Sequence, residues 1–141
     1  MKLFLDTSVI LAACLSETGA SRCIMDLAPA NGWRLLTTPF GVEETVRNLQ
    51  QLSNEASEYW EGKRSAIVLA EDILTLEWPA IFQPAKDKPI LFGALAWADV
   101  LLTLDQVDFI DQIGTDFYGL PILRPGQFLS RQRIEGTLIE L

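Results

Sequence analysis

The chain contains no histidine, and this absence excludes several kinds of active site. Without an imidazole, the chain cannot hold a Ser-His-Asp triad, a Cys-His dyad or a histidine general base. Zinc sites that are built on histidine are excluded for the same reason. Any chemistry carried by these residues must therefore use carboxylates, hydroxyls, lysine or a bound metal ion.

Cysteine is also scarce. Cys14 and Cys23 lie nine residues apart and form no CxxC pair. A disulfide framework or a thiolate metal site would need more cysteines at closer spacing. We therefore expect two buried thiols in a protein of the reducing cytoplasm.

Positive charge and long apolar runs are limited. The chain has 11 Lys and Arg against 19 Asp and Glu, which gives a net charge of -8. A field of this sign repels polyanions, so a nucleic-acid substrate would require metal ions, a local basic patch or a basic partner. The longest mainly apolar stretch, Ile90 to Leu104, is interrupted by Gly93 and Asp99. It is shorter than the roughly 20 residues of a membrane span, and we expect neither membrane association nor a signal peptide.

Length and composition predict one globular domain over residues 1–141. The chain has 141 residues, of which 49% are hydrophobic, and its mean hydropathy is +0.20. A core of this size forms without disulfides. No internal repeat or flexible linker divides the sequence.

Apolar runs that alternate with helical patterns predict an α/β fold. Thr7 or Ser8 is expected to cap the segment after the first strand, and the run Pro29-Ala30-Asn31-Gly32 is expected to break the first helix. The predicted strands cover 2–6, 33–38, 73–78, 99–105 and 119–125, the last one at a sheet edge. The predicted helices cover 19–29, a segment that begins at Pro39, 54–72, 90–97, 106–114 and 127–141. This alternation predicts a three-layer α/β/α fold with a central, mainly parallel sheet of about five strands.

Carboxylates stand beside turn signals at four places in the chain. Asp6 and Asp105 each follow an apolar strand, Glu43 and Glu44 open the helix after the second strand, and Asp87 precedes a predicted helix. Because the carboxyl ends of parallel strands meet at one edge of a sheet, we expect these groups to converge. Packed carboxylates raise one another's pKa, and a hard cation such as Mg²⁺ relieves this repulsion with oxygen ligands.

Taken in order, these segments resemble the PIN-domain family, in particular the small prokaryotic PIN proteins of toxin–antitoxin type. The matching segments are FLDTSVI (4–10), VEETVRNL (42–49), DKPIL (87–91), ADVLLTLD (98–105) and LPILRPGQFL (120–129). The resemblance implies a cytoplasmic ribonuclease in which bound Mg²⁺ or Mn²⁺ activates the water that attacks an RNA phosphodiester. It also implies a homodimer and a protein antitoxin as partner.

The resemblance also implies roles for single residues. The metal ligands and catalytic residues are Asp6, Glu44, Asp87 and Asp105. Glu44 is favoured over Glu43 by its distance from Leu49. Supporting roles fall to Thr7, Ser8, Glu43, Thr103 and Asp108. Independently of the resemblance, Arg47, Lys86 and Lys88 flank the proposed pocket and are candidate phosphate-binding residues, with surface charges in loose ion pairs as the alternative. Leu104 stands where the family usually has glycine, so the turn that presents Asp105 departs from the family pattern.

Purely structural explanations remain for the same carboxylates. An aspartate after a strand commonly caps a helix, and acidic residues favour a helix N-terminus on electrostatic grounds. Two other functions also remain open. One is a PIN-like protein-binding module without catalysis, and the other is a phosphotransfer domain of another α/β family. The second ranks lower, because a haloacid-type phosphatase would need an aspartate where Ser8 stands.

Overall fold

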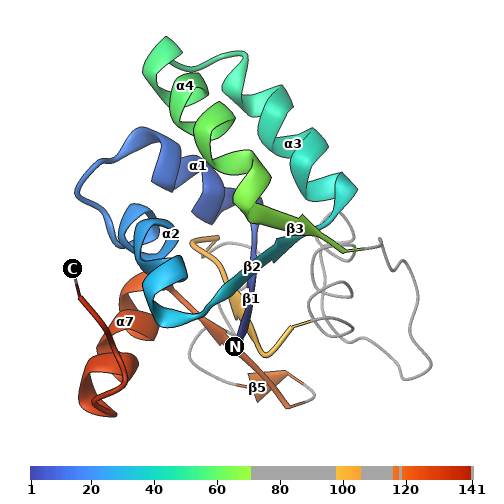
Figure 1. Cartoon of the computed structure of the whole chain (residues 1–141). Coiled ribbons are helices and arrows are strands. Elements are labelled where there is room, and N and C mark those ends of the chain that lie inside the picture. Colours follow the sequence, from blue (N-terminus) through green and yellow to red (C-terminus); the bar gives the residue numbers. More distant parts are fainter. Residues whose placement is uncertain (71–97, 106–115, 118, 141) are drawn as a thin grey trace.

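A computed structural model describes residues 1–70, 98–105, 116–117 and 119–140 of the chain. The described strands form a sheet in the order β3-β2-β1-β4-β6-β5. They are β1 (Lys2–Leu5), β2 (Arg34–Thr37), β3 (Ile67–Leu69), β4 (Val100–Leu102), β5 (Asp116–Phe117) and β6 (Leu120–Leu123). The pairings from β3 to β6 are parallel, and β5 pairs antiparallel with β6. The predicted α/β fold with a mainly parallel sheet is confirmed (Figure 1).

Helices connect the strands and pack on one another beside the sheet (Figure 1). They are α1 (Thr7–Leu15), α2 (Ala20–Asn31), α3 (Pro39–Leu49), α4 (Asn54–Lys63) and α7 (Pro125–Ile134), with the short 3₁₀ turn η1 (Arg64–Ala66) after α4. Helix α1 contacts α2, α3 and α4, and α2 contacts α7. No described helix is by itself long and apolar enough to cross a membrane; α1 and α2 meet that test only jointly, as a pair bent by 96°.

Both faces of the central strands are buried. Leu3 and Leu5 of β1 belong to the core formed with the helices, whereas Phe4 between them points to the opposite face and is equally inaccessible, at 0% exposure. Leu101 of β4 is likewise inaccessible and points to the same face as Phe4. A strand that is buried on both sides is typical of a sheet covered by two layers, as the three-layer fold requires. The prediction that the first strand is apolar on both faces is confirmed.

One of two predictions about the first helices was wrong. Asp6, not Thr7 or Ser8, is the N-cap of α1, because its side chain accepts a hydrogen bond from the Thr7 N–H at 2.9 Å. Helix α2 ends within the predicted break at Pro29-Ala30-Asn31-Gly32, because it continues through Pro29 to Asn31 and stops at Gly32 with φ of 67°. A left-handed glycine ends a helix at little conformational cost, whereas Pro29 removes one hydrogen bond within the last turn.

The predicted helix over 54–72 was also wrong in its second half. Helix α4 ends at Lys63, and Ile67–Leu69 forms β3, which pairs with β2 through Leu35 and Ile67. The β-branched residues Ile67 and Val68 suit a strand, and the open edge of β2 gives them a partner. This pairing is a long-range interaction that the charge-rich local pattern did not indicate.

The C-terminal predictions need correction as well. Strand β6 is not an edge strand, because β5 lies beyond it. Helix α7 spans Pro125–Ile134 instead of 127–141, with the proline in its first turn and Gly136, at φ of 73°, just past its end. Strand β4 is shorter than the predicted 99–105. The predicted strand 73–78 and the predicted helices 90–97 and 106–114 lie outside the described residues.

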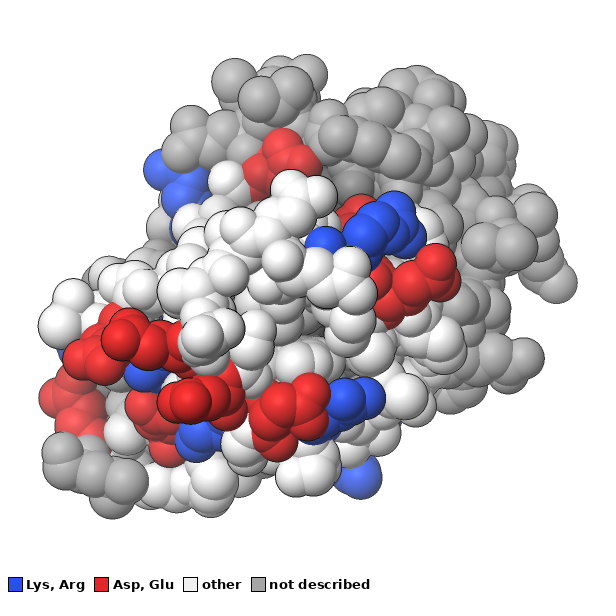
Figure 2. All heavy atoms as spheres, turned by 90° about the horizontal axis from the view of Figure 1, so that it is seen from above, with Lys and Arg blue, Asp and Glu red and all other residues white. Residues whose placement is uncertain are grey.

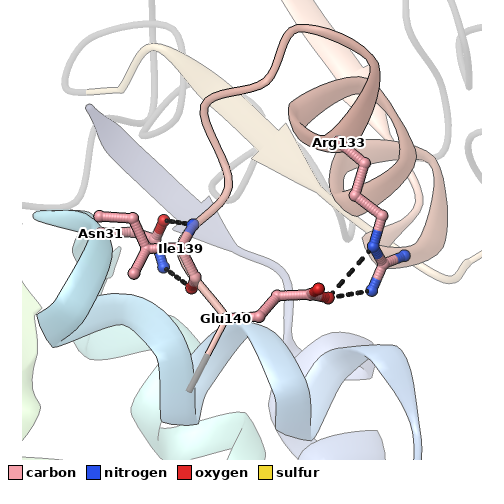
Figure 3. Close-up of polar contacts among 4 residues, drawn as sticks. All are labelled: Asn31, Arg133, Ile139 and Glu140. Carbon is pink, nitrogen blue, oxygen red and sulfur yellow. Dashed lines mark hydrogen bonds and ion pairs between the residues drawn. The ribbon is translucent and has the colours of Figure 1, made fainter.

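The segment after α7 folds back onto α2 (Figure 3). The Asn31 side chain donates to the Ile139 carbonyl at 2.9 Å and accepts from the Ile139 N–H at 2.7 Å. Arg133 and Glu140 form an ion pair at 2.8 Å across the same turn (Figure 3). These contacts join the end of the described chain to the helical layer.

Candidate functional site

Asp6 lies at the carboxyl end of β1, where the chain turns into α1. Its side chain is 3% exposed and accepts three hydrogen bonds. Oδ1 accepts from the Thr7 N–H at 2.9 Å, and Oδ2 accepts from the Ser8 and Thr103 hydroxyls, both at 2.8 Å. A carboxylate offers about four lone-pair directions, so about one remains for a further donor or a cation.

The two hydroxyls also fix the backbone that follows β4. Ser8 Oγ accepts from the Leu104 N–H at 3.0 Å, and Thr103 Oγ1 accepts from the Asp105 N–H at 3.0 Å. Each hydroxyl therefore donates to Asp6 and accepts from the loop that carries Asp105. This arrangement holds two carboxylate-bearing segments together, although they are far apart in sequence.

The pKa of Asp6 is raised from 3.8 to about 6. Burial is the largest cause, because it disfavours the charged form. The hydrogen bonds from Thr103 and Ser8 lower the pKa, while the negative charges of Glu44 and Asp105 raise it. Asp6, Glu44 and Asp105 thus come from β1, α3 and the loop after β4 and lie close enough to interact electrostatically.

The opening of α3 distinguishes the two adjacent glutamates. Thr38 caps this helix by accepting from the Gly41 N–H at 3.2 Å. Glu44 is half-buried and acts on the pKa of Asp6. Glu43 is exposed and pairs with Arg47 at 3.3 Å. Of the two glutamates, Glu44 is the one whose charge acts on the pKa of Asp6, and its role as a ligand stays a prediction.

Arg47, a predicted phosphate-binding residue, lies on the exposed side of α3. Its side chain is 62% exposed, and the pair with Glu43 contributes less than about 1 kcal/mol, because both charges are solvated. Such a weak partner leaves the guanidinium available to a stronger anion. The remaining predicted site residues, Lys86, Asp87, Lys88 and Asp108, lie outside the described residues.

Two observations bear on whether the site fits a metal ion. Within the part of the chain that the structure describes, no group of three or more His, Cys, Asp or Glu side chains reaches metal-binding geometry. The chemistry of the donors nevertheless suits a hard cation, because Asp6, Glu44 and Asp105 offer only oxygen atoms. Thr7 Oγ1 is another oxygen here, buried and without a hydrogen-bond partner.

Sequence reasoning missed two kinds of residue at this edge. Thr37 is fully buried and donates to the Leu5 carbonyl at 3.3 Å, which ties β2 to the end of β1. Arg124 directly follows β6, as Asp6 follows β1. The signal available in the sequence was its place after an apolar strand, which was applied to acidic residues alone.

No protein-family model matches the chain, and no curated protein sequence matches it.

Proposed function

We propose that the protein is a metal-dependent endoribonuclease that hydrolyses RNA phosphodiester bonds in the cytoplasm, as the toxin of a toxin–antitoxin pair. The observation that carries the proposal is the buried Asp6 carboxylate, whose pKa is raised partly by Glu44 and Asp105. A buried carboxylate close to two others is costly in free energy unless a cation or a bound proton balances its negative charge. The PIN-family resemblance, which is carried by the same residues, adds the reaction and the substrate class.

The described side chains have distinct tasks in this proposal. Asp6, Glu44 and Asp105, together with Asp87, would hold Mg²⁺ or Mn²⁺. Ser8 and Thr103 fix the orientation of the Asp6 carboxylate before any ion arrives. When bound, the cation supplies charge stabilisation at the phosphate and lowers the pKa of a nucleophilic water.

The charge of the molecule also agrees with a need for metal. A net charge of -8 repels RNA, and three carboxylates at one site repel it further. Divalent cations would reverse the local sign of the charge, and the exposed Arg47 together with Lys86 and Lys88 would add positive charge for the substrate. The family resemblance further suggests that the protein acts as a homodimer and is inhibited by a protein antitoxin.

The proposal is tested by RNA cleavage with and without added Mg²⁺ or Mn²⁺. Asp6→Asn and Asp105→Asn should each reduce the rate by at least about 100-fold, because several kcal/mol of transition-state stabilisation are lost. Asp99→Asn is the matched control, since Asp99 lies at the opposite end of β4 and is exposed, and its side chain accepts a hydrogen bond from the Lys2 N–H. If Asp6→Asn cleaves RNA at the same rate as Asp99→Asn, the assignment of Asp6 to the active site is wrong.

A second candidate is a PIN-like protein-binding module with weak or no catalysis. It is favoured by the lack of a three-residue metal-binding group among the described side chains. A hollow of about 380 Å³ between α1, α2 and α4 offers a docking surface with Glu17, Glu55 and Glu58 on its lining. Calorimetry separates the two functions, because a module without a metal site would not bind Mg²⁺ or Mn²⁺ at millimolar concentration.

A further inference from the structure

The register of the sheet aligns three residues at its carboxyl edge, one after each of the neighbouring strands β1, β4 and β6. Leu5 pairs with Leu102, and Leu102 pairs with Leu123. The residues that follow are Asp6, Thr103 and Arg124. The ladder continues through them, because the Asp6 N–H donates to the Leu102 carbonyl and the Thr103 N–H donates to the Leu123 carbonyl, both at 3.0 Å. Arg124 therefore lies beside Thr103, which in turn lies beside Asp6.

Strand alternation puts these three side chains on one face of the sheet. Leu5, Leu102 and Leu123 all belong to the core on the helical side. The next residue of an extended strand points the other way, and Asp6 and Arg124 both have extended backbone, with φ of -66° and -76°. The hydrogen bond between Thr103 and Asp6 shows directly that two of the three side chains meet there. Arg124 extends from the same face, two strands away from Asp6.

Helix stability does not explain an arginine at this position. Arg124 is the N-cap of α7, where residues with an acceptor oxygen are favoured and positive charge opposes the helix dipole. Gln127 provides the local polar contact instead, by accepting from the Arg124 N–H at 2.9 Å. Arg124 Nε is buried and has no hydrogen-bond partner. A buried donor without a partner indicates a group that is positioned for a ligand.

Five other cations in the described ranges have partners, whereas Lys2, Arg34 and Arg131 are exposed. The five with partners are Arg22 over the Tyr59 ring, Arg47 with Glu43, Lys63 with Asp26, Arg64 with Glu61, and Arg133 with Glu140. Arg124 differs from all of these in being half-buried at the carboxyl edge of the sheet, two strands from Asp6, with an unpaired and buried Nε. It is thus a source of positive charge at the edge where the proposed substrate would lie.

We propose that Arg124 is a substrate-binding residue that holds a backbone phosphate of single-stranded RNA against the carboxylate cluster. The inference rests on the proposed nuclease function and adds a specific anchor for the substrate. A guanidinium presents planar, paired donors that match phosphate oxygens, which a lysine does not. Its charge also offsets the repulsion between RNA and the acidic site.

The test compares Arg124→Gln and Arg124→Lys with Arg131→Gln. Arg131 lies on the same helix, is exposed, and gives the same change in net charge. Binding of a short fluorescein-labelled single-stranded RNA is measured by anisotropy, with Ca²⁺ in place of Mg²⁺ to prevent cleavage. Arg124→Gln should weaken binding by about ten-fold and reduce the slope of log affinity against log salt by about one, with Arg124→Lys in between. Arg131→Gln should bind like the wild type.

Mn²⁺ affinity and melting temperature distinguish this role from a structural one. Arg124→Gln should bind Mn²⁺ at least as tightly as the wild type, because a nearby positive charge is removed, and its Tm should be no lower. Loss of Mn²⁺ affinity or of Tm together with RNA binding would indicate a structural role and overturn the inference. Wild-type RNA affinity in Arg124→Gln would overturn it while leaving the proposed nuclease standing. A wild-type protein that binds neither Mn²⁺ nor RNA would overturn both.

Discussion

The Asp6 carboxylate combines two tasks that sequence reasoning had treated as alternatives. It caps α1 through the Thr7 N–H, and it also lies in the group of carboxylates with Glu44 and Asp105. The cap occupies one oxygen, and the Ser8 and Thr103 hydroxyls occupy the other only in part. A structural role for an aspartate at a strand end therefore does not argue against a ligand role.

The raised pKa of Asp6 predicts a pH-dependent stability. In the folded state its pKa is about 6, against an ordinary value of 3.8. Between these values the folded state binds the proton more tightly, so its contribution to stability is complete below about pH 4 and is lost as the pH rises through about 6. The loss amounts to about 3 kcal/mol for a shift of roughly two units.

Denaturant unfolding of the metal-free protein across this pH range measures the effect. The difference between wild type and Asp6→Asn isolates the contribution of one carboxyl group. The decline in stability should be present in the wild type and absent from the variant. Identical pH profiles for the two proteins would show that Asp6 is not held in the environment described above.

Glu43 and Glu44 form a matched pair for a second prediction. Glu44 acts on Asp6, whereas Glu43 is exposed and paired with Arg47. Glu44→Gln should weaken Mn²⁺ binding by about ten-fold or more, because one carboxylate oxygen ligand is lost. Glu43→Gln should leave it nearly unchanged, with both affinities read by calorimetry. The reverse order would mean that Glu43 is the ligand.

At the scale of elements, local signals predicted some boundaries well and missed others. Strands β1 and β2 and helix α3 follow from apolar runs and from Pro39 at a helix start. Strand β3 did not follow, because its pairing with β2 is a long-range interaction. The end of α2 at Gly32 lies within the predicted break, whereas the predicted end of α7 was wrong because Gly136 was not considered.

Two glycines test the account of helix ends. Gly32 ends α2 with φ of 67°, while Gly62 lies inside α4 with nothing within 4 Å of an added Cβ. Gly32→Ala should destabilise the protein by about 1 kcal/mol, because alanine resists the left-handed conformation. Gly62→Ala should stabilise it by about 0.5–1 kcal/mol, because alanine is the better helix former. Chemical denaturation measures both, and a stabilising Gly32→Ala would contradict the assigned helix end.

At the scale of the molecule, acidic residues outnumber basic ones, 19 to 11. Figure 2 shows Asp and Glu crowded over one end of the face in view, with Lys and Arg scattered among them. Together with the net charge of -8, this distribution makes any RNA binding dependent on divalent ions and on a few well-placed cations. RNA affinity should therefore rise with Ca²⁺ or Mg²⁺ at constant ionic strength, and an RNA affinity that is insensitive to these ions would contradict a metal-centred site.

The part of the candidate site that depends on where strands end and helices begin could be predicted from the sequence. Asp6 and Asp105 could be placed together because parallel strands end at one edge, and Glu44 because it opens the helix after β2. The same rule would have placed Arg124 at this edge had it been applied to basic residues, but its register next to Thr103 depends on the pairing of β6 with β4, which no local signal shows. The network in which Ser8 and Thr103 hold Asp6 likewise depends on tertiary packing.

The most direct test of the central claim is a calorimetric titration of the intact protein with Mn²⁺, carried out beside the same titration of Asp6→Asn. The account predicts saturable binding by the wild type at millimolar concentration or below, and a large loss of that binding in the variant. Equal heats for the two proteins, or no binding by either, would contradict a divalent-cation site at the carboxyl edge of β1 and β4.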